Sequence, residues 1–328
     1  MHYRVHGARW FRLCLLQTGP ENDDDFMNED NDPALKLKQW LRGWMSPELR
    51  STLRKRLAEP LGFVFRRDLP RLAIIYASDK WGSHSYAWHY AQHFQHLRRK
   101  QLTLLEIGIG GNEDPHAGGG SLRMWRRYFP NGQIVGLDCF DKSFHAEKRI
   151  RIYRGDQSSE ECLQRIVGEV GRPDIVIDDG SHLNAHVIKS FEVLFPLLAD
   201  DGIYVVEDTQ TSYLPDFGGS SDDMLHAPTS MCLFKRLVDG LNYEEFIKPG
   251  YRPSYYDRNI TSLHFYHNMV FIQKGLNQEG SNIVENNSKL KLREIVTGDL
   301  VRHQVGRPII ASRTADNSNH AESKVASD

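Results

Sequence analysis

Two short apolar runs that each end in acidic residues constrain this chain more than any other feature. One run, residues 173–177, leads into Asp178 and Asp179, and a second ends in Glu207 and Asp208. Apolar runs of this length are typical of buried strands. If the two strands are neighbours in a parallel sheet, four carboxylates meet at one edge. Because like charges that close repel each other, this arrangement predicts a bound cation or a shared proton.

We interpret the acidic edge as a site for magnesium or a similar hard divalent cation. Such cations prefer oxygen ligands, and Asp179, Glu207 and Asp208 supply three carboxylates. A bound cation would lower the pKa of a coordinated hydroxyl, and His182 follows closely enough to take the proton as a general base. Asp178 points differently along the strand, so we expect it to bond the backbone and have a structural role.

Two other interpretations of these residues are weaker. His182 and His186 are four residues apart, which on a helix resembles a zinc pair, but no cysteine or third histidine is placed to complete the site. Alternatively, Asp179 and Glu207 only cap helices. That alternative leaves His182 and Asp208 unexplained, so the cation site is favoured.

Apolar strands alternate with amphipathic helices through the centre of the chain, which predicts an α/β fold with a doubly wound, mostly parallel sheet. Two further runs, separated by His267 and Asn268, predict an antiparallel hairpin that closes a seven-stranded, Rossmann-like sheet. The expected strands are residues 103–107, 133–137, 149–153, 174–177, 203–206, 260–266 and 269–273, and the expected helices include 46–58, 121–129, 160–170, 184–198 and 231–241.

The first strand ends in a glycine turn that decides between two cofactors. A dinucleotide site requires a third small residue three positions after Gly110, but that residue is Glu113. A nicotinamide-dependent oxidoreductase is the alternative function. Glu113 disfavours it, because an acidic side chain would repel the pyrophosphate. S-adenosylmethionine, which carries a sulfonium and no phosphate, fits the acidic surroundings better.

Each part of S-adenosylmethionine has a candidate partner at the strand ends. Glu106 suits the ammonium or sulfonium, the glycines allow close approach, and Ser121, expected as a helix N-cap, suits the carboxylate. Acidic residues that end the next strands suit the ribose and adenine, although they could be ordinary loop caps. The candidate cofactor-binding residues are Glu106, Gly108, Gly110, Ser121, Asp138, Asp156, Gln157 and Asp179.

Composition excludes several classes of partner. The net charge is −2 with a pI near 6.7, and no basic block predicts nucleic-acid binding. The apolar runs are too short to span a membrane, and the N-terminal apolar patch is too short for a signal peptide. Four widely spaced cysteines predict reduced, buried thiols in a cytoplasmic protein. Translation from Met27 is an alternative start.

Five motifs, in order along the chain, resemble the macrolide-sugar O-methyltransferases. They are DKWGSHSY (79–86), LEIGIGG (105–111), DDGSH (178–182), EDTQTSY (207–213) and HFYHN (264–268). The resemblance implies a class I methyltransferase that uses S-adenosylmethionine and Mg²⁺, with the cation at Asp179, Glu207 and Asp208 and His182 as base. It also implies a sugar hydroxyl of a glycosylated natural product as acceptor, a role in antibiotic biosynthesis and secondary metabolism, and homo-oligomer formation.

The extent of this resemblance, together with the sequence patterns on either side of it, divides the chain into three expected parts. Residues 1–75 form an N-terminal helical cap with a mobile start, residues 76–281 form the methyltransferase domain, and residues 282–328 form a polar, partly disordered extension. A non-catalytic scaffold is a further alternative. It is disfavoured because a scaffold has no physical reason to keep Asp179, His182, Glu207 and Asp208 together.

Overall fold

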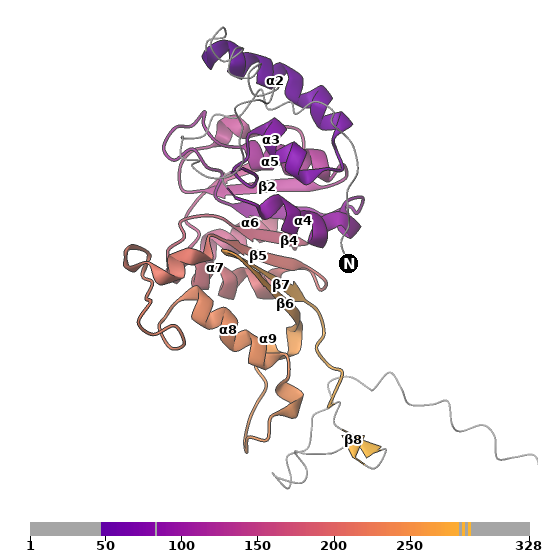
Figure 1. Ribbon diagram of the computed structural model, residues 1–328, viewed down its shortest axis with the longest axis vertical. Helices are drawn as coiled ribbons and strands as arrows, with labels where there is room; N and C mark the ends of the chain where they lie inside the picture. Colours follow the sequence, from indigo (N-terminus) through magenta and orange to yellow (C-terminus); the bar gives the residue numbers. More distant parts are fainter. Residues whose placement is uncertain (1–46, 83, 282–283, 286–287, 290–328) are drawn as a thin grey trace, which may run out of the picture.

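The computed structural model describes residues 47–82, 84–281, 284–285 and 288–289, and its centre is a seven-stranded sheet (Figure 1). The strand order is β3-β2-β1-β4-β5-β7-β6, so the order reverses between β1 and β4. Strands β1 to β5 are parallel, whereas β7 is antiparallel to both β5 and β6. The predicted fold is confirmed. The strands are β1 (Thr103–Ile107), β2 (Gln133–Asp138), β3 (Ile150–Arg154), β4 (Ile175–Asp178), β5 (Ile203–Glu207), β6 (Ile260–Tyr266) and β7 (Met269–Lys274).

Helices cover both faces of the sheet because side chains that alternate along each strand are apolar on both sides. In β4, Ile175 and Ile177 pack with the helices of one face, and Val176 packs with those of the other. The first face carries α3 (Leu69–Tyr76), α4 (Tyr86–Phe94) and α5 (Gly120–Tyr128). The second face carries α6 (Glu160–Val170), α7 (Asn184–Leu197) and α8 (Ser230–Gly240).

The start of α5 differs from the prediction. The helix begins at Gly120, and its N-cap is Gly119, which has a left-handed backbone and no side chain to cap with. Ser121 is therefore inside the first turn, and the expectation that it is the N-cap is wrong. Its hydroxyl instead donates to Glu106 Oε2 over 2.9 Å, because the helix start lies directly over the end of β1.

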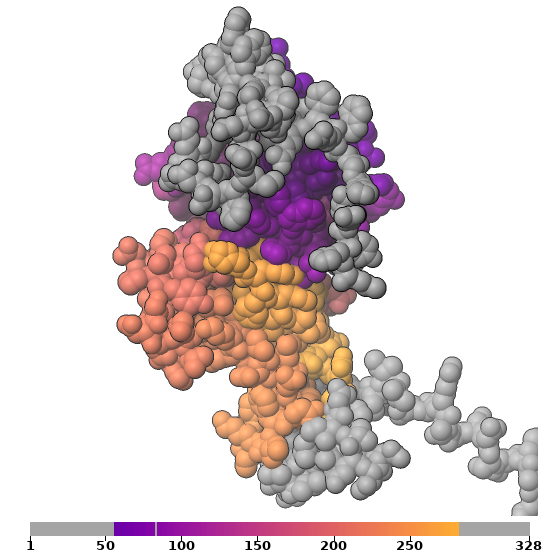
Figure 2. Space-filling model, in the orientation of Figure 1, coloured from indigo at the N-terminus to yellow at the C-terminus, as the bar shows by residue number. Residues whose placement is uncertain are grey.

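The hairpin β6–β7 packs beside α4. His93 Nε2 lies 3.0 Å from the Tyr266 hydroxyl, and the ring of His89 stacks on Tyr266 at 3.8 Å between centroids. Figure 2 shows the hairpin, in yellow-orange, at the surface directly beside the purple N-terminal helices. The histidines of α4 thus belong to a half-buried helix with polar ring tips.

Several remaining elements extend or limit the expectations. Helix α2 (Pro47–Val64) begins at the expected proline but continues six residues past the predicted end at Ala58. Helix α9 (Tyr255–Asn259) precedes the hairpin, and β8 (Val284–Glu285) and β9 (Ser288–Lys289) form a separate two-stranded ladder. Most of residues 1–46 and 282–328 lies outside the described residues, so the three-part division stays a prediction.

The structure also tests the predicted burial of the cysteines and the predicted lack of membrane-spanning helices among the described residues. Cys232 is buried, but Cys139 is exposed because it lies in the loop that follows β2, so the prediction of buried thiols is wrong for Cys139. None of the described helices combines the length and the apolar character that a membrane-spanning segment requires.

Candidate active site

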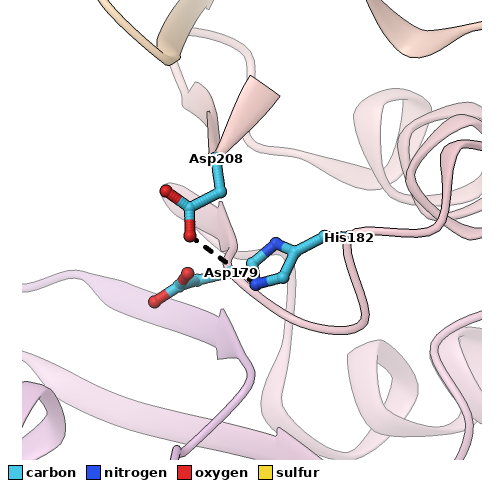
Figure 3. Close-up of side chains that lie close together, drawn as sticks. All are labelled: Asp179, His182 and Asp208. Carbon is cyan, nitrogen blue, oxygen red and sulfur yellow. Dashed lines mark ion pairs between the residues drawn. The ribbon is translucent and has the colours of Figure 1, made fainter. Parts of the chain in front are cut away.

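Three of the predicted site residues converge at the carboxyl edge of the sheet. Asp179 directly follows β4, and Asp208 directly follows the adjacent strand β5. With His182 they form the one group of three acidic, histidine or cysteine side chains in the described part of the chain whose ligand atoms all lie within 4.8 Å of one another. Figure 3 shows the imidazole pointing toward both carboxylates. His182 Nε2 lies 3.7 Å from Asp208 Oδ2.

The backbone turns sharply at two of these residues. His182 has φ +58° and Asp208 has φ +53°, a left-handed conformation that is uncommon for residues other than glycine. Residues in such conformations cluster at functional sites, where the surrounding structure holds them. Here, the Tyr86 hydroxyl lies 2.7 Å from Asp208 Oδ1 and 3.3 Å from the carbonyl oxygen of Asn268. Helix α4 and the hairpin therefore fix the Asp208 carboxylate.

Glu207, predicted as a third metal ligand, lies behind this group. Its Oε1 accepts hydrogen bonds from Tyr90 over 2.5 Å and from Lys80 over 2.6 Å, and the residue is buried. Burial, together with the nearby Asp179 carboxylate, raises the pKa of Glu207 well above its usual range. Its role as a metal ligand stays a prediction.

Lys80 lies at the centre of the carboxylates. Its Nζ is 2.6 Å from Glu207, 2.8 Å from Asp179 Oδ2 and 3.3 Å from Glu106 Oε1, and its side chain has no solvent exposure. Burial alone would lower the pKa of Lys80, but the three carboxylates outweigh it and hold the pKa well above the usual value. The ammonium is thus charged, and it neutralises part of the acidic edge.

No role was predicted from the sequence for Lys80, Tyr86 or Tyr90. Lys80 lies in the loop between α3 and α4, 99 residues before Asp179 and 127 before Glu207, so no spacing rule connects them. One signal was present, since carboxylates crowded at one edge require a cation and a lysine supplies one. Both tyrosines lie on α4, a helix that contains none of the acidic residues from which the site was predicted.

The two glycines of the turn have different surroundings. A Cβ on Gly108 would lie only 2.0 Å from the carbonyl oxygen of Asp179, so this glycine allows the β1 and β4 loops to pack together. A Cβ on Gly110 would meet nothing closer than 3.9 Å. Both have positive φ. Of the two, Gly110 keeps open space beside it, as close approach of a cofactor requires.

The other cofactor candidates lie in or after β1, β2 and β3, except Ser121, which lies in the first turn of α5. Asp138, half-buried, accepts backbone N–H bonds from Ile109 and Phe140, each over 2.9 Å. This ties the end of β2 to the glycine turn. Asp156 is exposed and accepts from the Ser158 backbone and hydroxyl, each over 2.8 Å. Glu106 and Ser121 are both buried and face each other.

Gln157 and Asp178 form a second buried network behind the site. Gln157 Nε2 donates to Asp178 Oδ1 over 3.1 Å, and its Oε1 accepts from the Ser181 backbone over 2.7 Å. Asp178 also accepts from the Ser190 and Tyr204 hydroxyls. The structural role expected for Asp178 is thus observed, but its main partners are side chains rather than the backbone.

His186 does not pair with His182. His186 lies inside α7, whereas His182 precedes that helix with a left-handed backbone, so the two are not on one helical face. The His186 Nδ1 instead lies 3.0 Å from the Ser181 hydroxyl. The geometry gives no support to the zinc alternative.

The donor set at the edge fits a hard divalent cation. Asp179 and Asp208 present carboxylate oxygens from neighbouring strand ends, and the side chain of each is 18% exposed. Hard cations such as Mg²⁺ prefer oxygen ligands and keep several waters, which requires partial exposure. Burial raises the pKa of Asp179 against the opposing effect of Lys80, as expected for a carboxylate that lacks a full set of partners.

Comparison with known proteins connects this geometry to a chemistry. The mycinamicin VI 2''-O-methyltransferase of Micromonospora griseorubida is 49% identical over 215 residues, which are 65% of this chain and 54% of that protein. The demethylmacrocin O-methyltransferase of Streptomyces fradiae is 48% identical over 215 residues, with the same shares of the two chains. The matched region is homologous to antibiotic-sugar O-methyltransferases. The chain spans about half the length of these relatives.

Solved structures agree with this homology. The methyltransferase MycE of the mycinamycin pathway, in complex with Mg, S-adenosylhomocysteine and mycinamycin VI, matches with a TM-score of 0.63 and 49% identity. The match covers 65% of this chain and 55% of that one. The homologous region therefore has the class I methyltransferase fold. No protein-family model matches the chain, and nothing in these similarities supports the oxidoreductase alternative.

Proposed function

We propose that this protein transfers a methyl group from S-adenosylmethionine to a sugar hydroxyl of a glycosylated natural product, with the help of Mg²⁺. The observation that carries the proposal is the convergence of Asp179, His182 and Asp208 at the carboxyl edge of the sheet. The matched region, 65% of the chain, is 49% identical to an enzyme whose solved structure contains Mg, S-adenosylhomocysteine and mycinamycin VI. Ligands of open α/β sheets bind at this edge, near the point where the strand order reverses.

Asp179 and Asp208 are the residues best placed to hold the cation, with Glu207 as the third predicted carboxylate. When bound, the cation supplies Lewis acidity that lowers the pKa of an acceptor hydroxyl. Lys80 already occupies one oxygen of Asp179, which leaves its other oxygen for the metal. Tyr86 holds Asp208 in position, and such supporting bonds orient metal ligands.

His182 takes the proton of the acceptor hydroxyl. Its side chain is 25% exposed, so substrate can reach the ring, and Asp208 Oδ2 lies 3.7 Å from Nε2. A carboxylate at that distance stabilises the imidazolium that forms. Histidine suits this task because its usual pKa lies near neutral pH.

The methyl donor binds along the glycine turn, at Gly110 and the neighbouring strand ends. Asp138 is placed to accept from the ribose hydroxyls, and Asp156 with Gln157 is predicted to lie at the adenine. In the reaction, the bond from sulfur to the methyl carbon breaks while a bond from the acceptor oxygen to that carbon forms. The sulfur keeps the electron pair and leaves as neutral S-adenosylhomocysteine, and the hydroxyl proton goes to His182. Alignment of these three atoms carries much of the rate.

A cofactor-binding measurement tests the class of reaction. We expect calorimetry to detect binding of S-adenosylhomocysteine and no binding of NAD. Incubation with S-adenosylmethionine, Mg²⁺ and a panel of glycosylated macrolides and anthracycline-type polyketides should then release S-adenosylhomocysteine, detected by mass spectrometry, and EDTA should abolish the release. Binding of NAD without binding of S-adenosylhomocysteine would exclude the methyltransferase.

The proposed acceptor class is based on the relatives, whose names include mycinamicin VI and a rhamnosyl tetracenomycin. We infer a deoxysugar on an apolar aglycone as the acceptor class. Homo-oligomer formation and a cytoplasmic location stay predictions. Size-exclusion chromatography with light scattering would measure the first.

A further inference from the structure

Lys80 is a charged side chain enclosed in protein at a site that we propose for another cation. Its Nζ contacts three carboxylates within 3.3 Å, one from each of the adjacent strand ends β1, β4 and β5. Two of these carboxylates, those of Asp179 and Glu207, are also predicted metal ligands. The ammonium and a bound metal ion would therefore interact with the same two carboxylates.

The other buried lysines of the described chain do not show this arrangement. Lys142 Nζ lies 2.6 Å from the carbonyl oxygen of Asp114 and 3.4 Å from that of Ala117. Lys274 Nζ lies 2.9 and 2.8 Å from the carbonyl oxygens of Pro196 and Leu198. Lys142 and Lys80 both have no exposure, yet only Lys80 contacts carboxylates. Lys142 thus provides a matched control for the removal of a buried ammonium.

We propose that Lys80 is the resident counter-cation of the metal site, and that it weakens the affinity for the divalent cation. Without metal, Lys80 neutralises Asp179 and Glu207, which otherwise would be neighbouring like charges without compensation. With metal bound, the ammonium repels the cation across Asp179. Lys80 is a positioning residue that allows the site to remain folded when empty and to exchange its metal. This inference rests on the metal part of the proposed function.

The test compares Lys80→Met with wild type and with Lys142→Met. Methionine keeps much of the length of the lysine stem and removes the charge. In EDTA, we expect the Tm of Lys80→Met to fall by several degrees. Its Mg²⁺-induced rise in Tm should exceed that of wild type, and calorimetry should give a Kd for Mg²⁺ at least about tenfold lower. Lys142→Met should also lose Tm in EDTA but keep the wild-type response to Mg²⁺.

A second variant separates charge from packing. In Lys80→Met with Glu207→Gln, one charge of each sign is removed, so the Tm in EDTA should recover relative to Lys80→Met alone. Absence of that recovery, or failure of both variants to fold in saturating Mg²⁺, would show that the lysine stem rather than its charge matters.

Two other outcomes are distinguishable. A Lys80→Met protein with wild-type Tm in EDTA and wild-type affinity for Mg²⁺ would overturn the role of Lys80 while leaving the metal site in place. A wild-type protein that binds no Mg²⁺ would overturn the proposed metal-dependent function, and the inference about Lys80 with it.

Discussion

Asp178 and Asp179 are identical side chains in consecutive positions, yet they have opposite surroundings. Asp178 points to the face of α7, where it is 1% exposed and accepts hydrogen bonds from Gln157, Ser190 and Tyr204. Its neighbours are fixed neutral donors. Burial raises the pKa of Asp178 to about 6, although the bonds from Ser190 and Gln157 oppose the shift.

Asp179 points to the other face, toward charges. Its Oδ2 binds Lys80, and it lies in one cluster with His182 and Asp208. Its side chain is 18% exposed, so ligand can reach it. The comparison teaches that a carboxylate surrounded by fixed neutral donors supports the fold, whereas one with a charge on one side and solvent on the other is available for chemistry.

The largest difference between the two positions should be in metal response. We expect Asp179→Asn to reduce Mg²⁺-dependent methyl transfer by at least about 10³-fold, because the loss of a ligand removes the Lewis acid. It should also abolish the Mg²⁺-induced rise in Tm. Asp178→Asn is the matched control and should keep that rise. Equal loss of the Mg²⁺ response in both variants would contradict the comparison.

The next largest effect should come from His182. His182→Gln should lower kcat by about 10²- to 10⁴-fold, since the general base is lost, while the Kd for S-adenosylhomocysteine stays at its wild-type value. His186→Gln, four residues on, serves as control because His186 contacts Ser181, outside the cluster of Asp179, His182 and Asp208. Release of S-adenosylhomocysteine measures the rate. An unchanged kcat in His182→Gln would refute its role as base.

Tyr86→Phe tests how strongly the Tyr86 hydroxyl holds the Asp208 carboxylate in position for the metal. The variant removes one hydroxyl, which lies 2.7 Å from Asp208, and should weaken Mg²⁺ binding by about 10- to 100-fold. Titration calorimetry with Mg²⁺ measures the change. Tyr128→Phe, on the same face of the sheet, is a control that contacts none of the three ligands. If both variants bind Mg²⁺ equally well, Tyr86 does not position Asp208.

Ser190→Ala tests the buried network around Asp178. Removal of the hydroxyl leaves the buried Asp178 carboxylate with one donor fewer, which should cost about 1–3 kcal/mol of unfolding free energy. Urea denaturation measures this cost. Metal affinity should be that of wild type, and a large loss of Mg²⁺ binding would show that the two faces are coupled.

His93 should make a smaller contribution to stability that depends on pH. Burial, with a contribution from His264, lowers its pKa to about 4 from an ordinary value of 6.5. The unfolded chain therefore binds the proton more tightly, so stability is lost as the pH falls from about 6.5 to 4. His93→Gln should reduce the loss of unfolding free energy between pH 6.5 and pH 4 by about 1 kcal/mol. This value is smaller than the full pKa shift implies, because the side chain is partly exposed to solvent. An unchanged slope in denaturation between pH 4 and 6.5 would contradict the assignment.

The sheet was predictable because its signals are local. Each apolar run, each amphipathic helix and the two-residue hairpin turn is formed by residues that are close together in the sequence. All seven strands of the main sheet begin and end within about one residue of the expected bounds. The parallel order also placed Asp179 and Asp208 at one edge. The prediction for Ser121 was wrong because a cap depends on where the helix begins, and the observed N-cap, Gly119, lies two residues earlier.

The sequence by itself determined the α/β fold, the glycine turn and the set of acidic residues at the carboxyl edge. Only the tertiary structure decided which of those acids face each other and what neutralises them. Lys80, Tyr86 and Tyr90 come from a loop and a helix about a hundred residues upstream, and their contacts depend on how α4 packs on the sheet. Electrostatic partners are selected by distance in space, and that distance exists only once the core has formed.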